Sequence, residues 1–91
     1  MKRDIEREIR TVFDDWQRKK KLLDDHRRSR QRYLEMAEHA KACLDWNEYK
    51  FAVEGEATAR AMVARLEREV RECKGLFYEL RIEQKPVRIF D

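Results

Sequence analysis

The side chains with the clearest potential for metal chemistry lie in one short stretch of the first half of the chain. Glu35, Glu38 and His39 fall within five residues, and Glu35 and His39 share one face of a helix because they are four positions apart. Helical bundles bind metal ions with carboxylates and histidines placed in this way. The spacing departs from the Glu-x-x-His pattern of di-iron bundles, and solvated surface side chains are the simpler interpretation. A metal-binding bundle is therefore the second alternative to the function inferred below, and we expect no metal and no cofactor.

Other residues that could support catalysis are too scattered in the sequence to form a site. Cys43 and Cys73 are expected roughly 40 Å apart if the intervening helix is straight, so they should be separate buried thiols of a reducing compartment. An intermolecular disulfide or a reactive thiol is the alternative. His26 has no Ser or Cys nucleophile near it in the expected helix register. Gly55 and Gly75 are the only glycines, which excludes a glycine-rich phosphate loop. We expect no enzymatic activity.

A basic segment precedes the middle of the chain. Residues 1–32 contain 12 Lys and Arg against 7 Asp and Glu, whereas residues 33–91 contain 10 against 12. Three interpretations stay open: a solvated and locally compensated helix face, a site for the phosphates of a nucleic acid or nucleotide, or a docking site for an acidic protein surface. The candidate residues for partner or phosphate binding are Arg18, Lys19, Lys20, Lys21, Arg27, Arg28, Arg30 and Arg32.

The length and composition of the chain limit the kinds of secondary structure that can position these candidate residues. The chain has 91 residues, enough for one domain, and 45% of them are charged. Two Gly and one Pro are too few for a turn-rich all-β fold. No apolar run is long enough to span a membrane, and the first residues lack the apolar stretch of a signal peptide. We therefore expect a cytoplasmic protein without membrane association.

Apolar residues recur every three or four positions, which predicts two long helices. We expect a single all-α domain over residues 1–91: a helix over about 4–44, a turn over 45–48, a helix over about 48–82 and a short extended tail over 83–91. Asp4 is the expected N-cap of the first helix, and Asp45 with Glu48 forms an acidic version of the capping box for the second. The short turn makes the helices antiparallel, as a coiled-coil-like hairpin that assembles into a helical bundle.

The pairing of the two helices follows from where the turn is placed. A turn centred near residues 46–47 pairs residues whose numbers sum to about 93, so that Trp16 meets Phe77, Leu23 meets Val70 and Tyr33 meets Arg60. Small residues near the turn, Gly55 among them, would let the two backbones approach closely. A kink or helix break at residues 54–56 is the competing interpretation. In the basic segment Lys19, His26 and Arg30 occupy positions where this seam should be apolar.

The last part of the chain is compatible with two structures. Gly75 could end the helix, after which residues 76–90 would form a β-hairpin that turns before Val87. Alternatively the helix continues to about residue 82 and Pro86 stops it. We favour the second structure, because an isolated two-stranded hairpin is only marginally stable.

A two-helix hairpin buries a single seam, and a second apolar stripe is left over. This pattern predicts a homo-oligomer and a partner protein, because so thin a core contributes little net stability. The hypothesis is a non-enzymatic helical adaptor, chaperone or inhibitor, of a size and composition common among phage and mobile-element products. A nucleic-acid or nucleotide-binding hairpin that uses residues 18–32 is the alternative. The expected interface residues are Trp46, Phe51, Met62, Leu66, Phe77 and Phe90.

Overall fold

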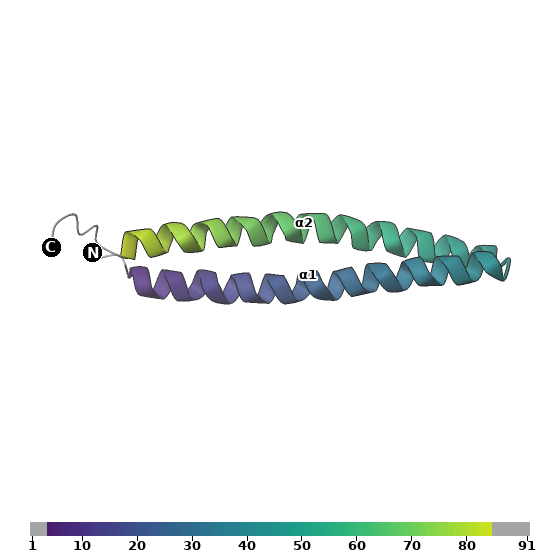
Figure 1. Cartoon of the computed structure of the whole chain (residues 1–91), viewed down its shortest axis with the longest axis horizontal. Helices are drawn as coiled ribbons and strands as arrows, with labels where there is room; N and C mark the ends of the chain where they lie inside the picture. Colours follow the sequence, from purple (N-terminus) through teal and green to yellow (C-terminus); the bar gives the residue numbers. More distant parts are fainter. Residues whose placement is uncertain (1–3, 85–91) are drawn as a thin grey trace.

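Two long helices lie side by side and antiparallel in the computed structural model, which describes residues 4–84 (Figure 1). Helix α1 spans Ile5–Ala42 and helix α2 spans Trp46–Gln84. The described hairpin is 59 Å long and 95% helical. The predicted all-α hairpin is confirmed. None of the helices in residues 4–84 has the length and apolar character of a membrane span.

Helix α1 begins and ends with the polar residues that helix termini favour. The Asp4 side chain accepts a hydrogen bond from the Arg7 backbone N–H at 3.0 Å, which confirms the predicted N-cap. Glu6 and Glu8 lie in the positive first turn, and Lys41 lies in the negative last turn, so both sets of charges complement the helix dipole.

The turn lies earlier than predicted: it comprises residues 43–45, not 45–48. The Asp45 and Leu44 backbone N–H groups donate to the carbonyls of Ala40 (2.9 Å) and Lys41 (3.2 Å), the two bonds of a Schellman C-cap. Leu44 occupies the left-handed position of this motif with φ 58°. Asp45 Oδ1 then accepts from the Glu48 N–H at 3.1 Å, so the predicted cap by Asp45 is confirmed. Because one residue closes α1 and caps α2, the loop is shorter than propensity alone indicates.

Helix α2 continues through both glycines. A Cβ on Gly55 would lie 2.5 Å from the Tyr33 ring, so Gly55 allows close packing, as predicted, and the alternative break at 54–56 is wrong. A Cβ on Gly75 would meet no other side chain or facing backbone within 4 Å, and the helix proceeds to Gln84. The alternative of a strand from residue 76 is therefore wrong for residues 76–84, as is the placement of Glu83 and Gln84 in the tail. The remainder of the predicted tail lies outside the described residues.

The core is a single seam between the two helices. Leu44 lies outside the seam, in the turn that joins them. Leu23, Val63 and Leu66 form its central cluster, with Met62 and Val70 packed against them, so the predicted partners Leu23 and Val70 belong to the same region of the seam. The fully buried residues on either side of this cluster are mostly small or apolar: Ala40, Ala52, Ala59, Cys73 and Leu80. The seam positions alternate by three and four residues, as in a coiled coil.

The earlier turn changes the register. Near the turn the numbers of facing residues sum to 86–88 rather than 93, as for Arg30 with Glu56 and Tyr33 with Gly55. Further from the turn the sums of contacting residues reach 92 and 94, as for Lys19 with Cys73 and Arg27 with Glu67. Tyr33 accordingly lies against Gly55 and Phe51 instead of Arg60. Trp16 still contacts Phe77, with ring centroids 5.4 Å apart, because large aromatic rings span more than one level.

Candidate interaction surfaces

Lys19, the first polar residue in the seam, forms a compact cluster with neighbours from both helices. Its Nζ lies 3.1 Å from Asp15 Oδ2 and 3.8 Å from Cys73 Sγ, and the Cys73 thiol donates to Asp15 Oδ2 at 3.5 Å. Hydrogen bonds from Arg18 and Lys19 lower the pKa of Asp15, and the bond to Asp15 raises the pKa of Lys19. Burial raises the pKa of the Cys73 thiol. Burial thus disfavours the thiolate form of Cys73, and the pairing with Asp15 satisfies the charge of Lys19 in the seam.

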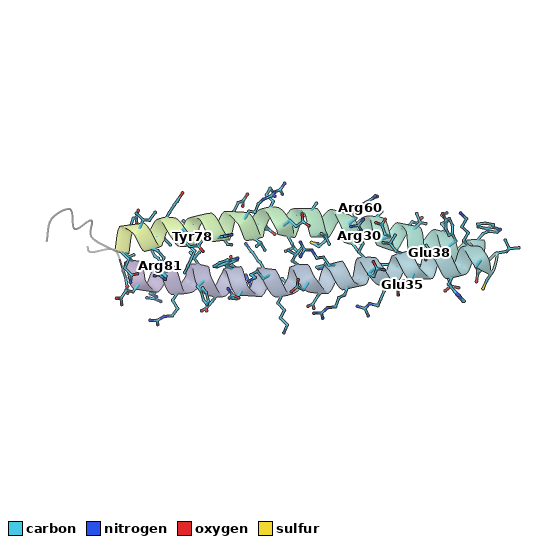
Figure 2. The ribbon with its side chains drawn as sticks, in the orientation of Figure 1. Arg30, Glu35, Glu38, Arg60, Tyr78 and Arg81 are labelled. Carbon is cyan, nitrogen blue, oxygen red and sulfur yellow. The ribbon has the colours of Figure 1, made fainter. Side chains whose placement is uncertain are left out.

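Arg30, another basic residue at a seam position, forms an ion pair with an acidic residue of α2. Its Nε lies 3.1 Å from Glu56 Oε1, and the Glu56 side chain is only 12% exposed. The same oxygen is 3.9 Å from Arg60 Nε, so one carboxylate lies between two guanidinium groups. Figure 2 labels Arg30 and Arg60 in the half of the hairpin nearer the turn. Lys19 and Arg30 thus pair with carboxylates, along α1 and across the hairpin respectively, which explains why the seam tolerates these two charges.

Most of the other predicted phosphate-binding residues also have acidic partners. Arg18 pairs with Asp15, Arg28 with Asp25 at 3.6 Å, and Arg27 with Asp24 and, across the hairpin, with Glu67 at 3.3 Å. Lys20 lies over the Trp16 ring at 5.4 Å from its centroid. Within residues 4–84, Lys21 and Arg32 have no carboxylate within ion-pair distance. Five of the eight predicted residues therefore have an acidic partner within the chain, and a sixth, Lys20, lies over an aromatic ring.

The residues considered for metal binding do not form a site. Glu35, Glu38 and His39 are exposed, and residues 4–84 contain no group of three or more His, Cys, Asp or Glu side chains placed to hold a metal ion. His39 Nε2 lies 3.7 Å from Cys43 Sγ near the turn. Cys43 is exposed, so its expected burial is wrong, whereas Cys73 is buried as expected.

The predicted interface residues differ in how far the hairpin itself uses them. Leu66 is 5% exposed in the seam, and Phe77 packs against Phe13 and Trp16, so both are used within the chain. Trp46 and Phe51 are 56% and 59% exposed. Met62 is half-buried at the edge of the central cluster. Phe90 lies outside the described residues.

One side of the hairpin, here called the apolar flank, has apolar side chains along its length. Leu22 and Met36 lie two heptads apart on α1, and Met62 and Leu76 lie two heptads apart on α2. Shallow grooves show that the two rows share a side: one is lined by Val12 and Leu76 and another by Met36 and Phe51. The apolar flank comprises Val12, Leu22, Met36, Phe51, Met62 and Leu76.

The opposite side, here called the basic flank, has charged residues at its middle. Its rows follow the heptad repeat, and the Arg27–Glu67 ion pair places the two rows on one side. Apolar side chains remain only towards its ends. The basic flank comprises Phe13, Lys20, Arg27 and Leu34 of α1 and Val53, Arg60, Glu67, Lys74 and Arg81 of α2. Of these, Arg60 and Arg81 are labelled in Figure 2.

Several exposed apolar residues did not enter the predicted interface. Leu34, Val53, Leu76 and Tyr78 are 38–53% exposed. Each lies one position away from a seam residue, and this flanking position is the sequence signal that identifies them. These residues could be assigned to a flank only once the register of the two helices was known, and the register depends on where the turn lies.

In comparisons with known proteins, the chain matches no family model, no curated protein and no solved structure.

Proposed function

We propose that the chain is a non-enzymatic helical interaction protein that binds a partner protein with side chains left outside its seam. One observation carries this proposal: ten large hydrophobic side chains in residues 4–84 are 38–71% exposed. Single exposed apolar residues are ordinary, but ten large ones on so small a hairpin are typical of surfaces that another protein covers. An adaptor, a chaperone or an inhibitor would act in this way.

The basic flank and the turn are the surfaces proposed for the partner. Leu34 and Val53 lie near the turn on the basic flank, and Trp46, at the turn itself, packs edge-on against Tyr49 with centroids 5.7 Å apart. Lys20 and Arg60 lie further along the same flank. A partner that offers apolar pockets beside an acidic stripe would complement this pattern, with the charges raising the association rate.

The experiment is affinity capture with matched variants. Trp46→Ser and the double variant Leu34→Ser/Val53→Ser remove exposed apolar area and should leave the helices intact by circular dichroism. Each should lose a protein that the unaltered chain captures in stoichiometric amount. Ala64→Ser, at another exposed helical position, is the control and should retain it. Capture that is equal for all four proteins would contradict the proposal.

Nucleic-acid binding is the second candidate, and the charge of the hairpin's middle favours it. Residues 17–33 and 55–71, which face each other, contain 12 Lys and Arg against 5 Asp and Glu. Phosphate contacts would make binding fall steeply between about 50 and 200 mM salt. Lys21→Glu/Arg32→Glu alters two basic residues of this region that form no ion pair within residues 4–84, and it should abolish such binding to a mixed-sequence duplex and a single strand. Absence of binding at 50 mM salt would contradict this candidate.

A further inference from the structure

We propose that His39 and Cys43 form one half of a zinc site, which a second copy of this chain completes with the same two side chains. This inference goes beyond the proposed function, because it concerns a metal ion rather than a partner protein. The sequence pattern grouped His39 with Glu35 and Glu38 and predicted no metal, whereas in the structure the neighbour of the imidazole is a thiol.

The imidazole and the thiol lie at the distance that a single tetrahedral zinc ion requires. His39 Nε2 is 3.7 Å from Cys43 Sγ. Zinc binds nitrogen at about 2.0–2.1 Å and thiolate sulfur at about 2.3 Å, so at the tetrahedral angle the two ligand atoms lie about 3.6 Å apart. Residues four positions apart share one face of a helix, which is why the two side chains converge. A zinc ion therefore fits between them without a change in the helix.

Both side chains can be reached from solvent. His39 and Cys43 are exposed, whereas the second thiol of the chain, Cys73, is buried in the seam beside Lys19 and Asp15. Zinc binds the thiolate, so its binding releases the proton of the thiol. At an exposed position this exchange does not require a charge to be buried. Of the two thiols, only Cys43 is therefore available to a metal ion.

The surroundings of the pair favour a cation. His39 lies in the last turn of α1 and Cys43 is its C-cap, where the carbonyls of the helix end carry a partial negative charge. Asp45 and Glu48 follow in the turn and the first turn of α2. Lys41 is the basic residue between the two ligands, but it lies two positions from each of them and therefore on the opposite side of α1.

One hairpin supplies only half of the ligands that a structural zinc ion needs. Such sites have four protein ligands in tetrahedral geometry. Residues 4–84 contain no group of three or more His, Cys, Asp or Glu side chains placed to hold a metal ion, so the pair has no third ligand of these types in its own chain. Two copies related by a two-fold axis through the metal supply two His and two Cys. This is the set of many structural zinc sites, and it is complete only in the dimer.

The position of the pair allows two copies to approach. Both residues lie at the turn end of the hairpin, opposite the end at which the described helices open (Figure 1). Two copies can therefore meet beside their turns without pairing along their flanks. Met36 lies one turn before His39 on the same face of α1, and it lines a shallow groove with Phe51, which is 59% exposed. These apolar side chains lie beside the proposed contact.

Sedimentation equilibrium of the full chain, kept reduced, tests the shared site. After treatment with a chelator the chain should have its monomer mass of 11.2 kDa. Zinc at one ion per two chains should double that mass, and excess chelator should reverse the change. Magnesium should have no effect, because it prefers oxygen ligands. A mass that zinc does not alter would show that the thiol and imidazole only share a hydrogen bond, and it would overturn the inference.

Cobalt tests the ligand set by its absorption spectrum. Tetrahedral Co²⁺ bound by thiolate has strong visible bands and a thiolate-to-metal charge-transfer band, which the hydrated ion lacks. The titration should saturate at one ion per two chains, and zinc should displace the cobalt because it is higher in the affinity order. Saturation at one ion per chain, or a spectrum like that of the hydrated ion, would contradict a site shared by two copies.

Single substitutions test which side chains bind the ion. His39→Ala and Cys43→Ala each remove two of the four ligands. Each should abolish the zinc-dependent dimer and raise the zinc Kd at least about 100-fold, since losing a residue that merely supports a ligand already costs about 10- to 100-fold. Both residues are exposed, so the helix content should not change.

Two matched variants are the controls. Glu35→Ala removes the exposed carboxylate four positions before His39, and Cys73→Ala removes the buried thiol. Both should keep the dimer and the zinc affinity of the unaltered chain. If Glu35→Ala weakens zinc binding as much as His39→Ala, the ion is bound elsewhere and the inference is overturned. A dimer that persists in excess chelator but is lost on reduction would be a disulfide between two Cys43 side chains, which would also overturn it.

Discussion

The half of the seam near the turn and the half near the open end hold the same two helices together with different side chains. Near the turn, Ala40 and Ala52 are completely buried and Gly55 lies under the Tyr33 ring. Near the open end, Phe13, Trp16 and Phe77 fill the space with ring centroids 5.4–6.1 Å apart. The Lys19 cluster lies at the boundary of the aromatic half. Close backbone contact and bulky rings are thus two solutions to burying a narrow seam.

The largest expected effect comes from removing a ring in the open half. Phe77→Ala leaves Phe13 and Trp16 without their shared partner and should lower the free energy of unfolding by about 2–3 kcal/mol, since the ring is half-buried. Urea unfolding followed by circular dichroism measures it. A loss below about 0.5 kcal/mol would show that the aromatic contacts do not hold this half.

The two glycines allow the same substitution in opposite surroundings. Gly55→Ala places a methyl group 2.5 Å from Tyr33 and should lower the free energy of unfolding by about 1–2 kcal/mol. Gly75→Ala meets no atom within 4 Å and should raise it by up to about 1 kcal/mol, through helix propensity. If both variants are stabilised in denaturant titrations, close approach in the turn half is refuted.

The polar cluster predicts a pH-dependent effect. Asp15→Asn removes the carboxylate that pairs with Lys19 and should lower the free energy of unfolding by about 1 kcal/mol at pH 7. The pKa of Asp15 is below its ordinary 3.8, so its contribution is present above that pH and is lost as the pH falls through the lower value. The difference between the two proteins should therefore shrink below about pH 4. An unchanged difference at pH 2 would show that the charge is irrelevant.

The smallest expected effect is at the turn. Leu44→Gly relieves a left-handed residue that is 71% exposed, and it should raise the free energy of unfolding by about 0.5 kcal/mol, after the added freedom of the unfolded chain is deducted. A thermal melt at matched concentration measures it. Destabilisation would mean that the Leu44 side chain contributes packing of its own.

The helices, their caps at Asp4 and Asp45 and the composition of the seam were predictable, because apolar periodicity and capping chemistry are local properties. The turn was not: leucine is rare at a left-handed C-cap, so Leu44 carried no signal. An error of a few residues in the turn shifted the register and paired Tyr33 with Arg60. The residues of the two flanks could be assigned only once the register was known, because the position of each side chain along the hairpin depends on it. Pairing within the basic segment, such as Arg30 with Glu56, likewise needed the facing helix.

Both flanks exist because α2 runs back along α1, and one distance between the two helices tests this arrangement. Spin labels are introduced at two exposed positions as Asp14→Cys and Gly75→Cys, with Cys43 and Cys73 replaced by Ala, and the labelled chain is diluted with unlabelled chain. The two positions lie 30 and 31 residues from Leu44, one on each helix. The hairpin predicts a distance of about 30 Å between the labels, which includes their arms. One continuous rod would separate them by about 90 Å, and that result would contradict the seam and both flanks together.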